Sequence, residues 1–202
     1  MDFREILKQR RMVRNYLPEP VPRDVLERIV ATVRRAPSGG FSQGQRLVVI
    51  TDVDTRAAIA RLAGEEESVA EGFEPWISHA PAHVVVWTRE EDYHDRYRKP
   101  DKLEEGEEIA WPAPYWYVDA GAALMLILLA AIDEGLAAGV FGVPAREVGA
   151  LAQLLDVPDD FRFVGIVTLG RAAPDPRWSA VTSRTTQRRK PVDELVRWER
   201  WS

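Results

Sequence analysis

The stretch VDAGAALMLILLAAIDEGLAAGVFG, from Val118 to Gly142, is the segment around which the 202-residue chain must fold. Apolar residues fill every face of its first half, which predicts a central helix that is buried on all sides. A membrane span is the alternative, but the unbroken apolar run is shorter than the roughly 20 residues that a bilayer core requires. The small residues Ala120 to Ala123 favour close approach of a symmetry mate or of a flat cofactor.

Length and composition favour one large domain over residues 1–202, because no linker rich in Pro, Gly or Ser divides the chain. The absence of cysteine excludes disulfides and cysteine nucleophiles and is typical of a reducing cytoplasm. The first residues lack the apolar core of a signal peptide. A net charge of -5 gives no general attraction to nucleic acid or to an anionic membrane. We therefore expect a cytoplasmic protein that binds neither.

Hydrophobic periodicity predicts a mixture of helices and short buried strands. The expected strands are 47–50, 82–88, 138–141 and 161–169, and the expected helices include 23–35 and 144–155. The acidic run 65–67 is expected to be a solvated surface. Residues 90–114 are acidic, aromatic and aperiodic, which predicts a surface excursion that is either a lid or disordered. Residues 191–202 are too apolar to be free in solution and must dock on something.

Two short segments are candidate ligand sites. The basic cluster with Arg10, Arg11 and Arg14 is either a solvated helix end or an anion site. The loop from Ser38 to Gly44 is expected to present free backbone N–H groups to a ligand. Several of the seven tryptophans, Trp76 among them, fall in loop-like context, which suggests a flat ligand or a protein interface.

The sequence lacks the motifs that are typical of several other enzyme classes. The sequence contains no P-loop, no GxSxG elbow, no HExxH and no dinucleotide fingerprint. His79 and His83 have metal-ligand spacing for a helix, but Pro81 lies between them, so we predict no metal site.

Taken together, the segments 10–16, 36–43 and 135–142 and the late group Arg188, Arg189, Lys190, Pro191 resemble the ordered motifs of the nitroreductase family of FMN flavoproteins. The family pattern is an Arg-Arg-Ser-x-Arg start, an Ala-Pro-Ser-x-x-Asn-x-Gln loop, a Gly-Leu-Gly turn and a late basic residue before a proline. The resemblance implies an α+β fold with a mostly antiparallel sheet flanked by helices. It also implies an intertwined homodimer with the flavin at the dimer interface.

The same resemblance assigns residues to the cofactor and to the substrate. The guanidinium groups of Arg10, Arg14 and Arg189, with Arg11 beside them, would bind the FMN phosphate, because arginine matches phosphate bidentately. The remaining implied cofactor contacts are Pro37, Ser38 and Gly39 along the isoalloxazine and ribityl, Gln43 at the pyrimidine edge or ribityl, Phe41, and Phe141 with Gly142 near N5. The expected substrate contacts are Phe41, Trp111, Tyr115 and Trp116.

Three positions depart from the family pattern. Met12 replaces a hydroxyl, Phe41 replaces an asparagine and Gln45 replaces a frequent tryptophan. Loss of the hydroxyl removes a hydrogen bond to a charged group, worth about 1.5 to 3 kcal/mol, and would weaken FMN binding if nothing replaces it.

The implied activity is that of an NAD(P)H oxidoreductase with a ping-pong reduction of nitroaromatics, quinones or related acceptors. The cofactor would perform the chemistry, so no catalytic acid or base is assigned. Residues 90–114 would roof the flavin, and residues 191–202 would dock as an arm on the partner subunit. An alternative that keeps the fold is a flavin or deazaflavin binding protein with little turnover, and a flavin-fragmenting enzyme has no residue signature here.

Overall fold

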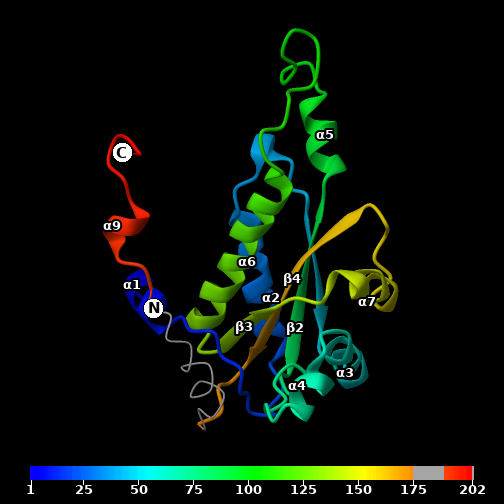
Figure 1. The fold of residues 1–202 in the computed structure, drawn as a ribbon, viewed down its shortest axis with the longest axis vertical. Coiled ribbons are helices and arrows are strands. Elements are labelled where there is room, and N and C mark those ends of the chain that lie inside the picture. The colour runs from blue at the N-terminus through cyan, green and yellow to red at the C-terminus, as the bar shows by residue number, and fades with distance from the viewer. Residues whose placement is uncertain (175–188, 202) are drawn as a thin grey trace.

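The computed structural model describes residues 1–174 and 189–201. A four-stranded antiparallel sheet, in the order β1-β2-β4-β3, organises the chain (Figure 1). The strands are β1 (Gln45–Ile50), β2 (Ala82–Arg89), β3 (Ala137–Phe141) and β4 (Phe161–Gly170). Each predicted strand is present, and the predicted antiparallel α+β class is confirmed.

Helices cover both faces of this sheet. The helices are α1 (Phe3–Gln9), α2 (Arg23–Ala31), α3 (Val53–Leu62), α4 (Glu65–Ala70), α5 (Glu91–Tyr97), α6 (Tyr115–Asp133), α7 (Val148–Leu154) and α9 (Val192–Leu195). Short 3₁₀ turns are Thr32–Arg35 after α2, Gly39–Phe41 before β1 and Ala145–Glu147 before α7.

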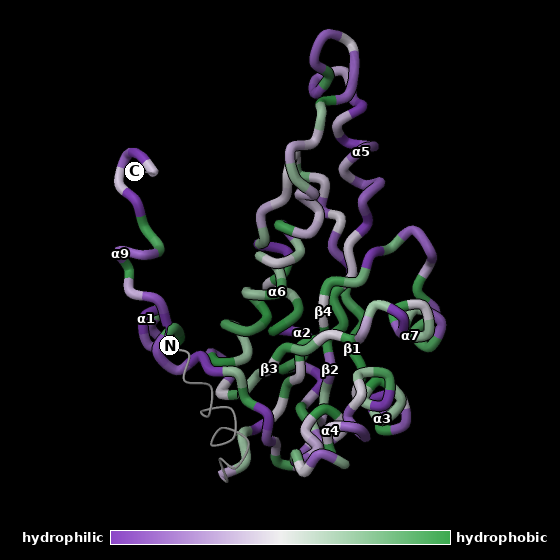
Figure 2. The backbone as a smooth tube through the Cα atoms, in the orientation of Figure 1, coloured by the Kyte–Doolittle hydropathy of each residue, from purple (hydrophilic) through white to green (hydrophobic). Residues whose placement is uncertain are grey.

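The central strand β2 explains the layering, because alternate side chains point to opposite faces of a strand. Val84 and Val86 pack with α2 and α6 on one face. Val85 and Trp87 pack with α3 and α7 on the other face. All four side chains are buried, which accounts for the continuous apolar run in the sequence. Figure 2 shows the same division, with apolar residues along the strands and α6 and polar residues along α5.

Helix α6 lies against the sheet as predicted, but the prediction that it is buried on all sides is wrong for one chain. Val118 is 57% exposed and Met125 is 44% exposed, and Gly121 between them is also exposed. These positions recur at helical spacing, so they form one apolar stripe on the face away from the sheet. By length and composition α6 could cross a membrane, although its opposite face packs on the strands.

Two predictions about polar segments need correction. Residues 90–114 do not form an aperiodic excursion throughout, because they begin with helix α5, which buries Tyr93. The acidic run 65–67 is not wholly solvated. Glu65 is only 7% exposed, since its carboxylate accepts backbone hydrogen bonds, whereas Glu66 and Glu67 belong to the surface of α4.

Candidate functional site

The arginine segment 10–14 leaves α1 and runs beside strand β3. The Val13 N–H donates to the Ala138 carbonyl at 3.0 Å, and Met12 forms a parallel bridge with the same residue. A Cβ on Gly139 would lie 2.5 Å from the Val13 carbonyl oxygen, so only glycine lets the segment pass this closely. A glycine is therefore required at position 139 of β3 so that the arginine segment can pass close to the strand.

The Tyr16 hydroxyl connects the arginine segment to strand β4. The Tyr16 hydroxyl lies 2.8 Å from the Val13 carbonyl oxygen and 2.7 Å from Thr168 Oγ1. Burial raises the pKa of Tyr16, so the phenol keeps its proton and can donate. Thr168 Oγ1 also reaches the Gly139 carbonyl at 3.3 Å. This pair was not predictable from the sequence, because Tyr16 and Thr168 lie far apart in the chain.

The arginines differ in their surroundings. Neither Arg10 nor Arg11 forms an ion pair with a carboxylate among residues 1–174 and 189–201. Arg14 is half-buried, and its guanidinium carbon lies 5.3 Å from the centroid of the Trp76 ring. Arg189 is exposed in the tail segment.

Phe141 and Gly142 lie at the end of β3. The Phe141 ring packs edge-on against Trp76, with centroids 5.6 Å apart, and against His83 at 5.8 Å. A Cβ on Gly142 would meet no atom of this chain within 4 Å. The space beside Gly142 is therefore open, and a flat ligand could approach the backbone there.

The loop from Pro37 to Gln43 differs from the prediction. Four of its N–H groups are engaged within the chain: that of Gly39 donates to Asp119, those of Phe41 and Gln43 donate to Ser38, and that of Ser42 donates to the Gly39 carbonyl. These four groups are therefore not offered to a ligand. Phe41 is 75% exposed, and both Phe41 (φ 63°) and Gln43 (φ 54°) have positive φ, a strain that clusters at functional sites.

Asp119 on α6 tethers this loop and was missed at the sequence level. Its carboxylate is 8% exposed and accepts hydrogen bonds from the Gly39 N–H and the Tyr93 hydroxyl, both at 2.8 Å. Burial and the neighbouring carboxylate raise the pKa of Tyr93, so the phenol remains a donor. An acidic residue within an apolar helix was the available signal, since a buried carboxylate requires donors.

Aromatic side chains from α5 and from the start of α6 form a cluster beside the loop. The rings of Tyr97 and Trp111 are 4.6 Å apart, and Trp111 lies 6.1 Å from Tyr115 and 6.0 Å from Trp116. The indole N–H of Trp111 donates to Glu108 at 2.7 Å. Burial opposes ionisation of Glu108, but the hydrogen bonds from Trp111 and His94 hold its pKa below the usual range. Three of the four expected substrate residues, Trp111, Tyr115 and Trp116, thus lie together within one chain.

The predicted residues therefore form two groups, which we call the arginine group (residues 10–14, 141 and 142) and the roof group (residues 37–43 and 111–116). Asp119 tethers the roof group to the start of α6, whereas the Met1 amino group pairs with Asp133 at its end, 2.8 Å away, and brings α1 there. Asp119 and Asp133 are about 20 Å apart along a helix that rises about 1.5 Å per residue. Figure 1 shows α1 and the roof group near opposite ends of α6.

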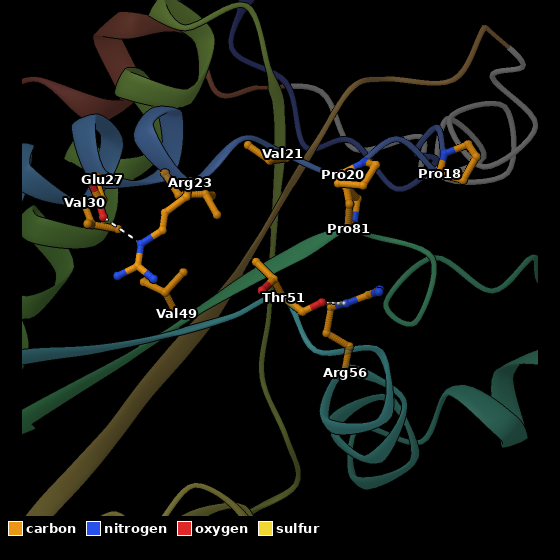
Figure 3. Close-up of a pocket in the computed structure, with 11 residues that line it drawn as sticks. Pro18, Pro20, Val21, Arg23, Glu27, Val30, Val49, Thr51, Arg56 and Pro81 are labelled. Atoms are coloured by element: carbon orange, nitrogen blue, oxygen red, sulfur yellow. Dashed lines mark hydrogen bonds and ion pairs between the residues drawn. The ribbon is translucent and has the colours of Figure 1, made fainter.

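A separate groove of about 470 Å³ runs beside strand β1 (Figure 3). Pro18, Pro20, Val21, Val49 and Pro81 give it apolar walls. Its charged groups are already engaged, because Arg23 pairs with Glu27 and Arg56 donates to the Thr51 carbonyl. None of the expected cofactor residues lines this groove.

The histidine pair does not form a metal site of the kind that its spacing permits. His83 is buried in β2, and its Nε2 lies 2.8 Å from the Ile77 carbonyl oxygen, whereas His79 is exposed. No cluster of three possible metal ligands occurs in the part of the chain that the structure describes.

Comparison with known proteins adds to this geometry. The family model described as "Nitroreductase family" matches residues 7–171. FMN reductase [NAD(P)H] from Bacillus subtilis (strain 168) is 30% identical over 85% of this chain and 68% of its own length. Iodotyrosine deiodinase from Nematostella vectensis is 26% identical over 96% of this chain and 74% of its own length. The crystal structure of oxidized iodotyrosine deiodinase bound to FMN and 3-iodo-L-tyrosine superposes with a TM-score of 0.64, at 20% identity, over 86% of this chain and 91% of that chain.

Proposed function

Because this chain belongs to the nitroreductase family, we propose that it is an FMN-dependent oxidoreductase that uses NAD(P)H to reduce a small aromatic or quinone acceptor. The similarity to an FMN reductase over 85% of the chain supports this activity. Trp111, Tyr115 and Trp116 form an aromatic surface at the roof group, which suits a flat acceptor.

The residues present fit FMN. A phosphate needs fixed cationic donors, and Arg10 and Arg11 carry no carboxylate partner among the described residues, unlike Arg23, which is paired with Glu27. A flat ring needs open space beside a backbone, and Gly142 has it. When bound, FMN supplies a ring nitrogen, N5, that accepts and donates hydride.

In this proposal, the residues of the protein bind FMN and position its ring. Arg10 and Arg14 would hold the phosphate, with Arg189 closing on it from the tail. The side chains of Ser38 and Gln43 would meet the ribityl and the pyrimidine edge, since four of the loop N–H groups are engaged within the chain. Gly142 would bring its backbone N–H toward the reactive edge of the ring. We assign no side chain as an acid or base.

The observation that carries the proposed assembly is the separation of the arginine segment 10–14 from the roof group along α6. One chain does not bring them together, so we propose that the site forms between two copies, with the arginine group of one facing the roof group of the other. The exposed stripe of Val118, Gly121 and Met125 would pack in that homodimer.

The tail supports the same arrangement. Trp198 is 87% exposed and Trp201 is 88% exposed, and α9 lies apart from the sheet in Figure 1. We propose that residues 191–201 of one copy dock on the other, where the unpaired edge of β1 and the groove beside it could receive an extended segment. The absence of cysteine supports a cytoplasmic location for this dimer.

A second candidate reaction is reductive removal of iodine from an iodinated tyrosine. It is favoured by the similarity to iodotyrosine deiodinase over 96% of this chain. The two candidates share the cofactor and differ only in the acceptor.

Anaerobic single-turnover kinetics test the proposal. The FMN-loaded protein should lose its flavin absorbance on mixing with NADPH or NADH and regain it on mixing with an acceptor. Reoxidation by a nitroarene or a quinone supports the first candidate, and reoxidation by 3-iodo-L-tyrosine with release of iodide supports the second. A protein that binds FMN but is reduced by neither nicotinamide would be a flavin binding protein with little turnover.

A further inference from the structure

Trp76 lies at the centre of the arginine group, although the sequence places it in a loop. It is 8% exposed and belongs to a buried cluster with Tyr16 and Ala137, against which Val13 and Phe141 pack. Its ring therefore contacts both parts of the group, the arginine segment and the end of β3. The sequence-based interpretation of Trp76 as a direct ligand or interface contact does not fit this burial.

The Arg14 guanidinium lies over the face of this ring. The distance from the guanidinium carbon to the ring centroid is 5.3 Å, within the range of a cation–π interaction. An aromatic face attracts a guanidinium and so limits the positions that the side chain takes. The Trp76 ring thus helps to fix where the Arg14 guanidinium lies.

The backbone of Trp76 is held in turn by the buried carboxylate of Glu65. Glu65 Oε1 accepts the backbone N–H of Trp76 at 2.7 Å and that of Ile77 at 2.6 Å, and Glu65 Oε2 accepts that of Ser78 at 3.2 Å. Hydrogen bonds to an ionised acceptor are about twice as strong as neutral ones. The segment between α4 and β2 is therefore fixed at the residue that carries the ring.

We infer that Trp76 is a positioning residue, whose ring holds the Arg14 guanidinium in place for the cofactor's phosphate, and that Glu65 fixes the backbone segment that carries the ring. The inference rests on the proposed function, because it assigns Arg14 to a phosphate. It also offers a reason why this chain tolerates Met12 in place of a hydroxyl. A pre-arranged Arg14 loses less side-chain entropy on binding, which offsets part of a missing hydrogen bond.

The test compares two ligands that differ only in the phosphate. Dissociation constants of FMN and riboflavin are measured by flavin fluorescence with apoprotein of the wild type, Trp76→Leu, Trp76→Phe and Glu65→Gln. We expect Trp76→Leu to weaken FMN binding by on the order of 3- to 30-fold, the equivalent of a cation–π contact, with riboflavin binding unchanged. Trp76→Phe should keep part of the preference for FMN, because phenylalanine retains an aromatic face. Glu65→Gln should weaken FMN binding in the same direction.

Trp87→Leu is the matched control. Trp87 is also buried, at 1% exposed, and its ring contacts Phe163, outside the arginine group. This variant should lose stability but keep the wild-type ratio of the two dissociation constants. Equal weakening of FMN and riboflavin by Trp76→Leu would mean that Trp76 is only structural, and an unchanged FMN affinity would also overturn the inference. A wild type that binds FMN no more tightly than riboflavin would instead overturn the proposed function, and this inference with it.

Discussion

Arg14 is the residue through which the proposed phosphate site can be tested most simply. Arg14→Ala and Arg189→Ala should each weaken FMN binding by about 10- to 100-fold, since each removes a hydrogen bond to a charged group worth about 1.5 to 3 kcal/mol. In protein saturated with FMN, the rate of flavin reduction should change little, because the phosphate contact is the same in ground and transition states. Equilibrium binding and stopped-flow reduction measure the two effects.

The matched control is Arg23→Ala, because Arg23 is exposed and pairs with Glu27 outside the arginine group. Wild-type FMN affinity in Arg14→Ala would remove the phosphate assignment.

His83 predicts a pH dependence of stability. Burial lowers the pKa of His83 to about 4 from its ordinary value of 6.5, so the unfolded chain binds the proton more readily. The free energy of unfolding should therefore fall as the pH drops below 6.5, with a total loss of about 3 kcal/mol from this residue once the pH is below 4. Urea denaturation between pH 7 and pH 4 should show a shallower loss for His83→Gln, whose amide can still donate to Ile77. His79→Gln, at an exposed position, should keep the wild-type slope, and equal slopes for all three proteins would contradict this origin.

Among single residues, the candidate ligand-binding side chains were easier to predict from the sequence than the buried carboxylates that fix the segments around them. Arg10 and Arg14 are recognisable by type and spacing. Asp119 and Glu65 are not, because their donors, Gly39 and Trp76, become neighbours only when the sheet and helices assemble. A buried carboxylate is chemically conspicuous, but its partner is set by tertiary structure.

At the scale of elements, the contact between the arginine segment and β3 depends on Gly139. In Gly139→Ala the added methyl group would lie 2.5 Å from the Val13 carbonyl oxygen and 2.9 Å from Thr168 Oγ1. We expect a loss of about 1 to 3 kcal/mol in the free energy of unfolding, as in an overpacked core, together with weaker FMN binding. Gly149→Ala is the control, because Gly149 lies in α7 with open space around its Cβ and should be neutral or more stable. Wild-type stability and FMN affinity in Gly139→Ala would show that the segment does not depend on this close approach.

The roof group should set acceptor specificity. Phe41→Ala and Trp111→Ala should each change kcat/KM for a bulky quinone by a different factor than for a small nitroarene, because the two acceptors cover different areas of the aromatic surface. FMN should remain bound in both variants, which flavin absorbance after dialysis verifies. If both acceptors respond equally or not at all, the acceptor binds elsewhere.

Elements with strong apolar patterns were predictable, and those held by polar contacts were not. The four strands follow from apolar runs in the sequence. Helix α5 was missed because Glu91–Tyr97 has no apolar stripe and buries only Tyr93, and its position depends on contacts such as that between Arg96 and the Gly40 carbonyl. The loop 37–43 was predicted as a ligand site, but the engagement of four of its N–H groups was not predicted, because their acceptors are Asp119 on α6 and atoms of the loop's own turn.

In the whole molecule, one chain holds the arginine segment 10–14 and the roof group near opposite ends of α6. Four large apolar side chains remain exposed in the single chain: Val118 and Met125 on α6, and Trp198 and Trp201 in the tail. A sequence predicts these apolar surfaces but not which of them remain exposed, since that depends on how the helix lies on the sheet.

Complementation between two defective subunits tests this arrangement most directly. One subunit carries Arg14→Ala and the other carries Ser38→Ala with Gln43→Ala, and each carries a different affinity tag. If the site forms between copies, the heterodimer has one site with both defects and one intact site, whereas either homodimer has only defective sites. The purified heterodimer should therefore bind one FMN per dimer with wild-type affinity. A heterodimer with no wild-type site, or a chain that binds FMN tightly as a monomer, would contradict a site shared between subunits.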